Sequence, residues 1–335
     1  MNRSTRILSA VLFAVALPLA AQVNDTYVIP AAASAPGAYG TQWKTQFSVF
    51  NPQLQHDLTV RVVFLPTGGG QGMTAKVPVG SNAIRYSDDI LYDLFGVSGT
   101  GALLVATFAE DNPGVPNTVL DQSFLVTTDT YNDSRNGTYG QTIPGIWTGL
   151  QDFATDGISG VVHGIRNSTK NGWRTNVGAV NLGRCTAHML VSVYDENGAT
   201  IVDHAPFDIP PLGHMQDRLE NLHGTHGGSV AELERGTLEF FIDDPCVKNA
   251  DNAAVVFPYT STVDQLSGDP AYQTPVLLAS AATVYGAKVS NAEFAAAQLT
   301  IGKKIDKTVV KGIADRAVDY GVVELKNSPT QRNLR

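Results

Sequence analysis

The sequence predicts an all-β protein that consists of two tandem antiparallel β-sandwiches and a C-terminal extension that is partly helical or disordered. Three observations support this prediction: a long internal repeat, short segments with period-two alternation between turn residues, and a change of composition after the second repeat. The length of 335 residues fits about two domains. We expect a signal peptide at 1–21, one module at 24–147, a second module at 158–276 and the extension at 277–335.

The internal repeat is clearest around two tryptophans. Residues 43–51 read WKTQFSVFN, and residues 173–181 read WRTNVGAVN. The further matches along the two copies are 58–64 with 189–194, Gly68 with Gly198, 88–96 with 216–224, 101–105 with 236–240, Tyr139 with Tyr272, and Pro144 with Pro275. Because the matches follow in one order at a spacing of roughly 130 residues, they indicate one structural unit used twice.

Alternation of apolar and polar residues predicts a half-buried antiparallel strand in each of these two segments. The residues predicted to face the core are Trp43, Thr45, Phe47 and Val49 in the first copy and Trp173, Thr175, Val177 and Ala179 in the second. We expect both tryptophans to anchor the core. Further short apolar segments occur between turn residues at 75–79, 103–108, 123–127, 238–242 and 253–259. This spacing favours a sandwich over a parallel sheet with crossover helices.

Each copy also contains one helix-start signal. Asp88 or Asp89 precedes an apolar segment at 90–94, and Asp217 precedes a matching segment at 219–222. An aspartate in this position can cap the first turn of a helix. We therefore expect a short helical crossover at the open end of each sandwich.

The C-terminal extension is rich in Lys and Arg, whereas the rest of the chain is acidic. Residues 290–293 fit a capping box before the apolar segment 294–299. A four-residue apolar spacing follows at Ile305, Val309, Ile313 and Ala317. The extension can form helix, dock on an acidic module, bind a partner or remain disordered.

The N-terminus has the features of a secretory signal peptide. Arg3 and Arg6 precede an apolar run at 7–17, and small residues follow as a cleavage site after Ala20 or Ala21. No second apolar stretch approaches the roughly 20 residues of a membrane helix. We expect a secreted, extracellular or periplasmic protein without a membrane span. The net charge of −8 gives no basic footprint for nucleic acid.

Both cysteines, Cys185 and Cys246, lie in the second copy. In an oxidising compartment such a pair predicts a disulfide. A loop of this size would contribute about 4 kcal/mol in the chain-entropy model. The alternative is two thiols that lie too far apart to pair.

The segment PGAYGTQWKT at 36–45 and the segment GTYGQ at 137–141 together resemble tandem immunoglobulin-like modules of uncharacterised secreted bacterial proteins. The resemblance covers about 24–276 and not the extension. It implies a β-sandwich, export and no assigned catalysis, and it carries over no active-site residues. In the second copy NSTKNG at 167–172 replaces the Pro-Gly element, so the two copies need not bind the same ligand.

Two groups of residues could hold a metal ion. His214, His223 and His226 with Asp217 and Glu220 suit zinc, but the loop lacks the fixed spacing of a helical zinc motif and can be a solvated loop. The oxygen-rich group that suits a structural calcium ion is Asp129, Asn132, Asp133 and Asn136, with Asp264 and Asp269 in the second copy. These residues lack EF-hand spacing, and such side chains also form simple turns.

The sequence offers no convincing catalytic set. The acidic pairs Asp88-Asp89 and Asp243-Asp244 are neighbours in sequence, which does not report the separation across a cleft that glycosidases need. No Gly-x-Ser-x-Gly elbow is present, and the glycines at 68–70 lack the Lys-Ser/Thr of a phosphate loop. We therefore expect a protein without enzymatic activity.

Aromatic residues near loop ends are the remaining candidates for a binding surface. The residues that could stack on a sugar or peptide are Tyr131, Tyr139, Trp147 and Tyr272, together with Phe153 and Tyr259. The leading hypothesis is a non-enzymatic protein for cell-surface structure, adhesion or assembly, whose partner is a surface protein or a glycan. A carbohydrate-binding protein and a hydrolase with a loop-built site are the alternatives.

Overall fold

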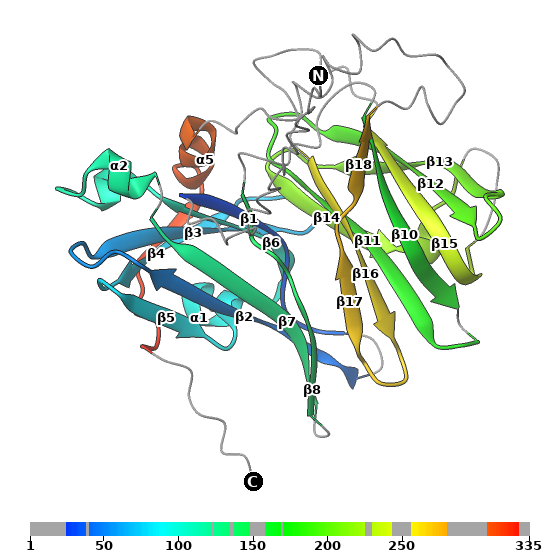
Figure 1. Ribbon diagram of the computed structural model, residues 1–335, viewed down its shortest axis with the longest axis horizontal. Helices are drawn as coiled ribbons and strands as arrows, with labels where there is room; N and C mark the ends of the chain where they lie inside the picture. The colour runs from blue at the N-terminus through cyan, green and yellow to red at the C-terminus, as the bar shows by residue number, and fades with distance from the viewer. Residues whose placement is uncertain are drawn as a thin grey trace, which may run out of the picture.

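The computed structural model describes residues 25–37, 40–121, 123–134, 137–147, 158–168, 170–224, 230–242, 256–279 and 307–327 (Figure 1). The strands of the first module are β1 (Thr26–Pro36), β2 (Gln42–Asn51), β3 (Leu58–Pro66), β4 (Met73–Val79), β5 (Ala83–Ser87), β6 (Gly99–Thr107), β7 (Leu125–Ser134), β8 (Gly137–Thr142) and β9 (Ile146–Trp147). Those of the second are β10 (Ile158–Ser168), β11 (Trp173–Asn181), β12 (Ala187–Asp195), β13 (Thr200–Ile209), β14 (Gly213–Arg218), β15 (Glu232–Ile242), β16 (Val256–Asp264), β17 (Pro270–Gln273) and β18 (Val276–Ala279). The predicted all-β class is confirmed.

The first sheet has the strand order β19-β4-β3-β6-β1-β2-β7-β8, where β19 is Val318–Val322, and it also carries β5 on β2 and β9 on β1. Strand β1 connects the two layers of the sandwich. One of its edges pairs with β6 from Thr26 to Ser34, and its other edge pairs first with β9 and at its last residues with β2. A register shift in the β6 pairing between Ile29 and Ala32 lies between these two partners. Side chains of both layers then meet in one core, including Val62 from β3 and Phe47 from β2.

The second sheet repeats this connectivity strand by strand. Its order is β13-β12-β15-β10-β11-β16-β17, with β14 on β11 and β18 on β10. Each strand from β1 to β9 therefore has its counterpart in β10 to β18, in the same sequence order and with the same neighbours. Gly68 and Gly198, which match in the sequence, both have a φ of 81° in the turn that follows the third strand. The predicted duplication is confirmed by this topology.

The most detailed copy lies at the asparagine that ends the second strand of each module. Asn51 is fully buried, its Nδ2 donates to the carbonyls of His56, Val79 and Gly80, and its Oδ1 accepts from the Gln53 amide. In the second module the corresponding bonds join Asn181 to Cys185, Ile209, Pro210 and Gly183. Each asparagine ties two loops together at one end of its sandwich, the loop that follows its own strand and the turn between the fourth and fifth strands of its module.

The prediction that the two tryptophans anchor the core is wrong. Trp43 and Trp173 are only half-buried, whereas Phe47 and Val177 further along the same strands are fully buried. Both tryptophans lie at the start of their strands, and neither belongs to the apolar core of its module. Trp43 lies against Gly37, and Trp173 lies under the Arg166 guanidinium at 5.0 Å.

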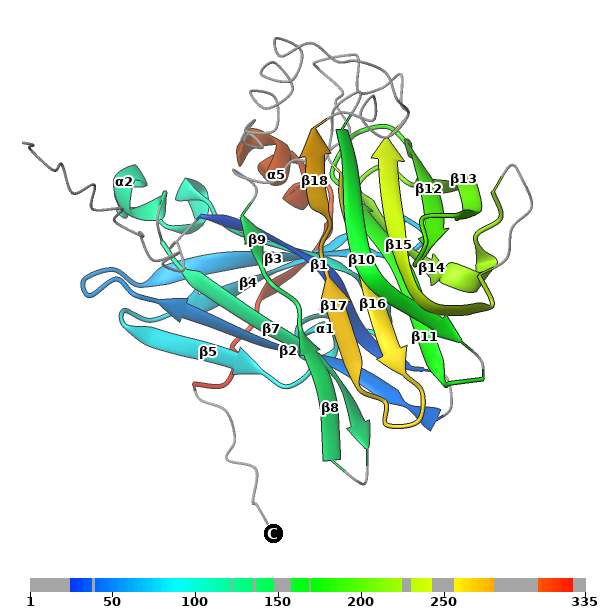
Figure 2. The ribbon, with the colours of Figure 1, turned by 45° about the vertical axis from the view of Figure 1, so that its right-hand side comes forward.

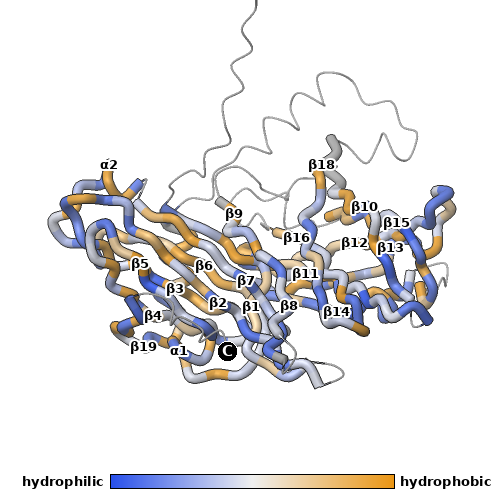
Figure 3. The backbone as a smooth tube through the Cα atoms, turned by 60° about the horizontal axis from the view of Figure 1, so that its bottom comes forward, coloured by the Kyte–Doolittle hydropathy of each residue, from blue (hydrophilic) through white to orange (hydrophobic). Residues whose placement is uncertain are grey.

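A third apolar cluster joins the two modules. The outer face of the β3–β6–β1 layer contributes Val63, Leu65 and Leu104, and the second module contributes Val180 and Phe257. Figure 3 shows hydrophobic residues along β6, and nearly every residue of β3 is buried, which fits strands that are covered on both faces. The modules therefore pack against each other through a shared core.

The extension belongs to the first module over 307–327. Helix α5 (Lys307–Ala314) buries Val310 and Ile313 in the third cluster, and Figure 1 shows it beside β1 and β3. Strand β19 then pairs in parallel with β4 at the edge of the sheet. The four-residue apolar spacing thus predicted a helix correctly, and the disordered alternative is wrong for this segment.

A group of ion pairs lies between α5 and the sandwich. Arg61 bonds Asp111 at 2.6 Å and reaches Asp315, just after α5, at 3.4 Å. Lys76 also bonds Asp111 at 2.8 Å, and Lys311 of α5 pairs with Glu110 at 3.3 Å. Burial raises the pKa of Asp111, but the bonds from Arg61 and Lys76 outweigh it, so the pKa of this carboxyl lies below its usual value.

The predicted helical crossovers are present in different forms. Helix α1 (Ile90–Phe95) begins after Asp89, whose side chain accepts a hydrogen bond from the Tyr92 amide. The second copy has only the 3-10 turn η3 (Leu219–Asn221), and Asp217 bonds the Arg218 amide and the Asn221 side chain. The first module also contains η2 (Ala109–Asp111) and α2 (Asn117–Leu120), which the sequence did not indicate.

Several predictions lie outside the described residues: the signal peptide and the capping box at 290–293, and also the segment 148–157, which is expected to link the two modules. Cys246 also lies outside them, so its pairing with Cys185 stays a prediction. The second sheet continues through β18 to Ala279, three residues past the predicted boundary at 276. Among the described residues, no helix has the length and apolar character needed to cross a membrane.

Candidate functional site

The aromatic residues predicted as a binding surface have different surroundings. Tyr131 is buried, and its hydroxyl donates to the Asp88 carbonyl. Tyr139 is half-buried on β8, and Trp147 pairs with Tyr27 through β9. Phe153 lies outside the described residues. Tyr272 stacks on Tyr259 with ring centres 5.3 Å apart, and its hydroxyl is buried without a hydrogen-bond partner in the described part of the chain.

The oxygen atoms predicted for calcium are engaged by protein donors. Asp129 accepts from Thr142, Asn132 accepts from the Gln42 amide, and Asp133 pairs with Lys44 at 2.9 Å. These three residues lie on strand β7 and not in a loop, while Asn136 lies outside the described residues. Within the described ranges no group of three or more His, Cys, Asp or Glu side chains could hold a metal ion. His226, one of the predicted zinc ligands, is outside those ranges.

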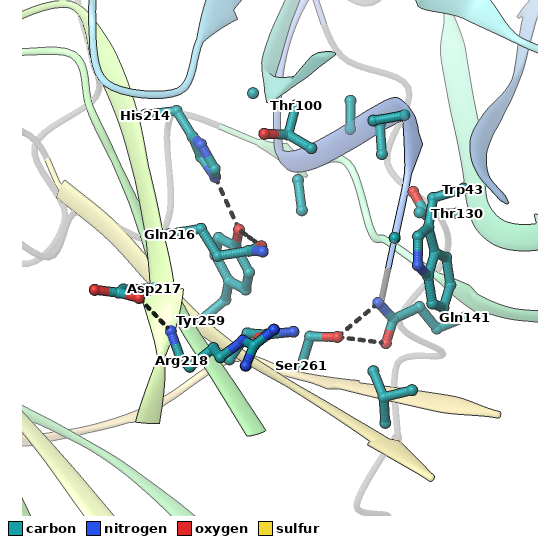
Figure 4. Close-up of a pocket in the computed structure, with 18 of the residues that line it drawn as sticks. Trp43, Thr100, Thr130, Gln141, His214, Gln216, Asp217, Arg218, Tyr259 and Ser261 are labelled. Atoms are coloured by element: carbon teal, nitrogen blue, oxygen red, sulfur yellow. Dashed lines mark hydrogen bonds between the residues drawn. The ribbon is translucent and has the colours of Figure 1, made fainter. Parts of the chain in front are cut away.

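A cleft of about 290 Å³ opens between the modules. Figure 4 shows His214, Gln216 and Tyr259 on one side of it and Trp43 and Gln141 on the other. The first module lines the cleft with Ala31, Ala32, Ala33, Ala35, Pro36, Gly37, Trp43, Thr100, Gly101, Thr130 and Gln141, and the second with Arg174, Asn176, His214, Gln216, Asp217, Arg218, Tyr259, Ser261 and Val263. Figure 2 shows β8 and β17 side by side along the junction.

A chain of hydrogen bonds crosses the junction beside the cleft. Thr100 and Thr67 of the first module bond each other at 2.9 Å, and Thr67 bonds His214 Nδ1 at 2.7 Å. His214 Nε2 bonds the Tyr259 hydroxyl at 2.8 Å, and this hydroxyl donates to Gln216 Oε1 at 2.8 Å. Because the tyrosine proton goes to Gln216, the ring of His214 must donate from Nε2. Complete burial lowers the pKa of His214 to about 3, so the imidazole is neutral at pH 7 and accepts from Thr67 at Nδ1.

One glycine makes this arrangement possible. The ring of Tyr259 lies directly over Gly178, where a Cβ atom would be 2.2 Å from Tyr259 Cζ. The first copy has Ser48 at the position of Gly178, and Thr127 at the position of Tyr259, as the strand registers show. The first copy therefore pairs a serine with a threonine where the second copy pairs a glycine with a tyrosine.

The pH dependence of stability should report on His214. Complete burial lowers the pKa of His214 from 6.5 to about 3, so the unfolded chain binds this proton more readily. Stability from this residue is complete above pH 6.5 and falls as the pH drops toward 3, by about 2 kcal/mol between pH 7 and pH 5. In urea unfolding, His214→Gln should remove this part of the pH dependence, and His163→Gln, at an exposed position, should retain it. An unchanged pH slope in His214→Gln would contradict the assignment.

The sequence predicted other roles for three residues of this site: His214 as a zinc ligand, Tyr259 as a stacking residue and Trp43 as a core residue. It did not indicate Arg174 or Gln216. The signal that the sequence held was the change from Ser48 to Gly178 between the two aligned strands.

A scan against protein-family models and a search of curated proteins found no match to the chain. The resemblance to immunoglobulin-like modules therefore stays a prediction.

Proposed function

We propose that this chain is an exported, non-enzymatic binding protein that acts in adhesion or assembly, and that it contacts its partner at the cleft between the modules. One observation carries this proposal: the cleft is built jointly by two modules that share a core and a hydrogen-bond chain. A junction packed and hydrogen-bonded in this way favours a preorganised binding surface, and preorganisation reduces the ordering cost of association. The immunoglobulin-like resemblance is part of the same proposal.

The chemistry of the cleft supports binding over catalysis. Asp217 is the one carboxylate among the described residues that line it, whereas glycosidic hydrolysis uses two carboxylates across the substrate. His214 is bonded at both ring nitrogens, and Ser261 bonds Gln141 and not a base. The described residues of this cleft therefore do not provide the acid–base pair that a hydrolase would need.

Carbohydrate binding is the second candidate function. Trp43 lines the cleft, and Gln141, Gln216 and Asn176 add amide groups to its walls. An aromatic face beside amide groups suits the apolar face and the hydroxyls of a sugar ring.

The two tryptophans of the repeat provide the test. We expect Trp43→Ala to weaken binding of the purified protein to the surface of the cells that produce it by about 10-fold or more. Trp173→Ala should leave binding unchanged, because Trp173 opens the equivalent strand but does not line the cleft. Binding would be measured by flow cytometry with fluorescently labelled protein.

Equal loss in both variants, or retention in both, would argue against the cleft. Deletion of the C-terminal extension is not a clean test, since α5 and β19 are part of the first module.

A further inference from the structure

We infer that the cleft selects an acidic saccharide, a single sugar ring that carries a carboxylate; this inference rests on the proposed binding function. The wall of the cleft that the second module provides is rich in hydrogen-bond donors. Arg174 and Arg218 both line it, and a guanidinium group only donates hydrogen bonds. Two such groups on one wall favour a ligand with negatively charged acceptor atoms.

The hydrogen-bond chain adds a third donor. Because Tyr259 donates to Gln216 Oε1, the carbonyl end of this amide is occupied and its NH₂ group is the end left to face a ligand. Burial raises the pKa of Tyr259 above its usual value, so this tyrosine keeps its proton and its direction of donation. Tyr259 thus orients the Gln216 amide through a direct hydrogen bond, and His214 holds the Tyr259 hydroxyl in place.

The acidic groups near this wall are already engaged. Asp217 Oδ1 accepts from the Arg218 amide at 2.7 Å and from the Asn221 side chain at 2.6 Å. Glu220 pairs with Arg218 at 3.1 Å, where the arginine side chain is 49% exposed. A surface pair of this exposure contributes little free energy, so a ligand carboxylate can compete for the Arg218 guanidinium.

The opposite wall suits a flat ring. Trp43 stands there, and Gly37 lies so close to it that a Cβ atom would be 2.4 Å from the indole Nε1. Alanines of β1 form the adjoining surface, and at the register shift Ala31 has no partner in the β1–β6 pairing. Small side chains leave room for a ring, and Ala31 offers backbone groups outside the pairing.

The size of the cleft limits the ligand. A volume of about 290 Å³ lies at the lower end of small-molecule sites, which fits one sugar ring. An acidic sugar would place its carboxylate at Arg174 and Arg218 and its ring against Trp43. Its hydroxyls would then face the amide groups of the cleft. An acidic peptide side chain would use the arginines but not the tryptophan face.

The test measures binding of methyl glucuronide, methyl glucoside and N-acetylglutamate amide to the full chain by ligand-observed NMR and calorimetry. We expect the glucuronide to bind at least 10-fold more tightly than the other two probes. Arg218→Gln should reduce glucuronide affinity about 10-fold, or about 1.4 kcal/mol, and leave weak glucoside binding unchanged. Arg235→Gln, at an exposed arginine that does not line the cleft, should leave glucuronide binding unchanged.

Three outcomes would overturn the inference. Equal binding of glucoside and glucuronide would mean that the cleft takes neutral sugars, and stronger binding of N-acetylglutamate amide would point to an acidic peptide. No binding of any probe, while Trp43→Ala still abolishes attachment to cells, would reject the ligand class and keep the proposed function. Retained attachment in Trp43→Ala would reject the proposed function itself.

Discussion

Replacement of Asn51 by alanine is expected to lower the free energy of unfolding by about 3–5 kcal/mol, and Asn181→Ala should do the same in the second module. Both side chains are fully buried. Asn51 Nδ2 contacts three carbonyls at 2.8–3.2 Å, and its Oδ1 accepts from the Gln53 amide at 2.9 Å. Alanine would leave these backbone groups without a partner, and buried polar groups without partners are costly.

Chemical unfolding followed by circular dichroism would measure this loss. Asn197→Ala, at an exposed turn position, is the matched control and should change stability by less than about 0.5 kcal/mol. Asn51→Asp tests the donor role of the side chain at nearly constant size. Its carboxylate cannot donate to the three carbonyls and would place negative charge against them. We expect Asn51→Asp to be at least as unstable as Asn51→Ala at pH 7. A loss below about 1 kcal/mol in Asn51→Ala would show that these bonds do not organise the loops.

The paired asparagines also explain which parts of the repeat are structural. Tryptophan leads each repeated segment, yet Asn51 and Asn181 at the other end make the equivalent sets of bonds. Trp43 and Trp173 instead have different neighbours. Duplication therefore preserved the loop-tying asparagine, while the strand starts diverged, one of them into the cleft.

Local patterns predicted the strands because period-two alternation depends on few neighbours. The segment 43–51 placed Phe47 and Val49 in the core correctly. The same pattern failed for Trp43, since burial at a strand end depends on whether the opposite layer reaches it. Alternation describes a strand's faces and not its ends.

Contacts between distant segments left weaker signals. Strand β3 reads LTVRVVFLP and is buried on both faces, which indicates a covering element without identifying it. That cover is α5 and the second module. The parallel pairing of β19 with β4 joins the C-terminal segment to the first sheet, and no periodicity in 318–322 specifies this partner.

The cleft was the least predictable feature, because its residues come from two modules. His214 lies on β14 and Tyr259 on β16, and both strands pair with β11. Thr67 and Thr100 belong to the first module. No sequence spacing relates these four positions. Only packing of the modules brings them together.

The docking of α5 supports the second large expected effect. Ile313→Asp should destabilise the docked helix by at least about 4 kcal/mol, since it removes a buried side chain and places a charge in an apolar cluster. Ile313 is 3% exposed and shares the third cluster with Val63, Leu65 and Leu104. Once α5 leaves, the part of this cluster that α5 covers becomes exposed, and exposed apolar patches promote association.

Limited proteolysis and light scattering would follow this release. We expect Ile313→Asp to be cleaved near 307–327 at least 10-fold faster than the wild type and to aggregate on mild heating. Arg316→Asp, an exposed position just after α5, introduces the same side chain and should behave like the wild type. If Ile313→Asp kept wild-type protease resistance, the third cluster would not depend on α5, and the C-terminal segment would be an appendage of the sandwich. The pairs of Asp315 with Arg61 and of Lys311 with Glu110 would not hold α5 in place without the apolar contact, because Asp315, Lys311 and Glu110 are largely exposed and exposed ion pairs contribute little on their own.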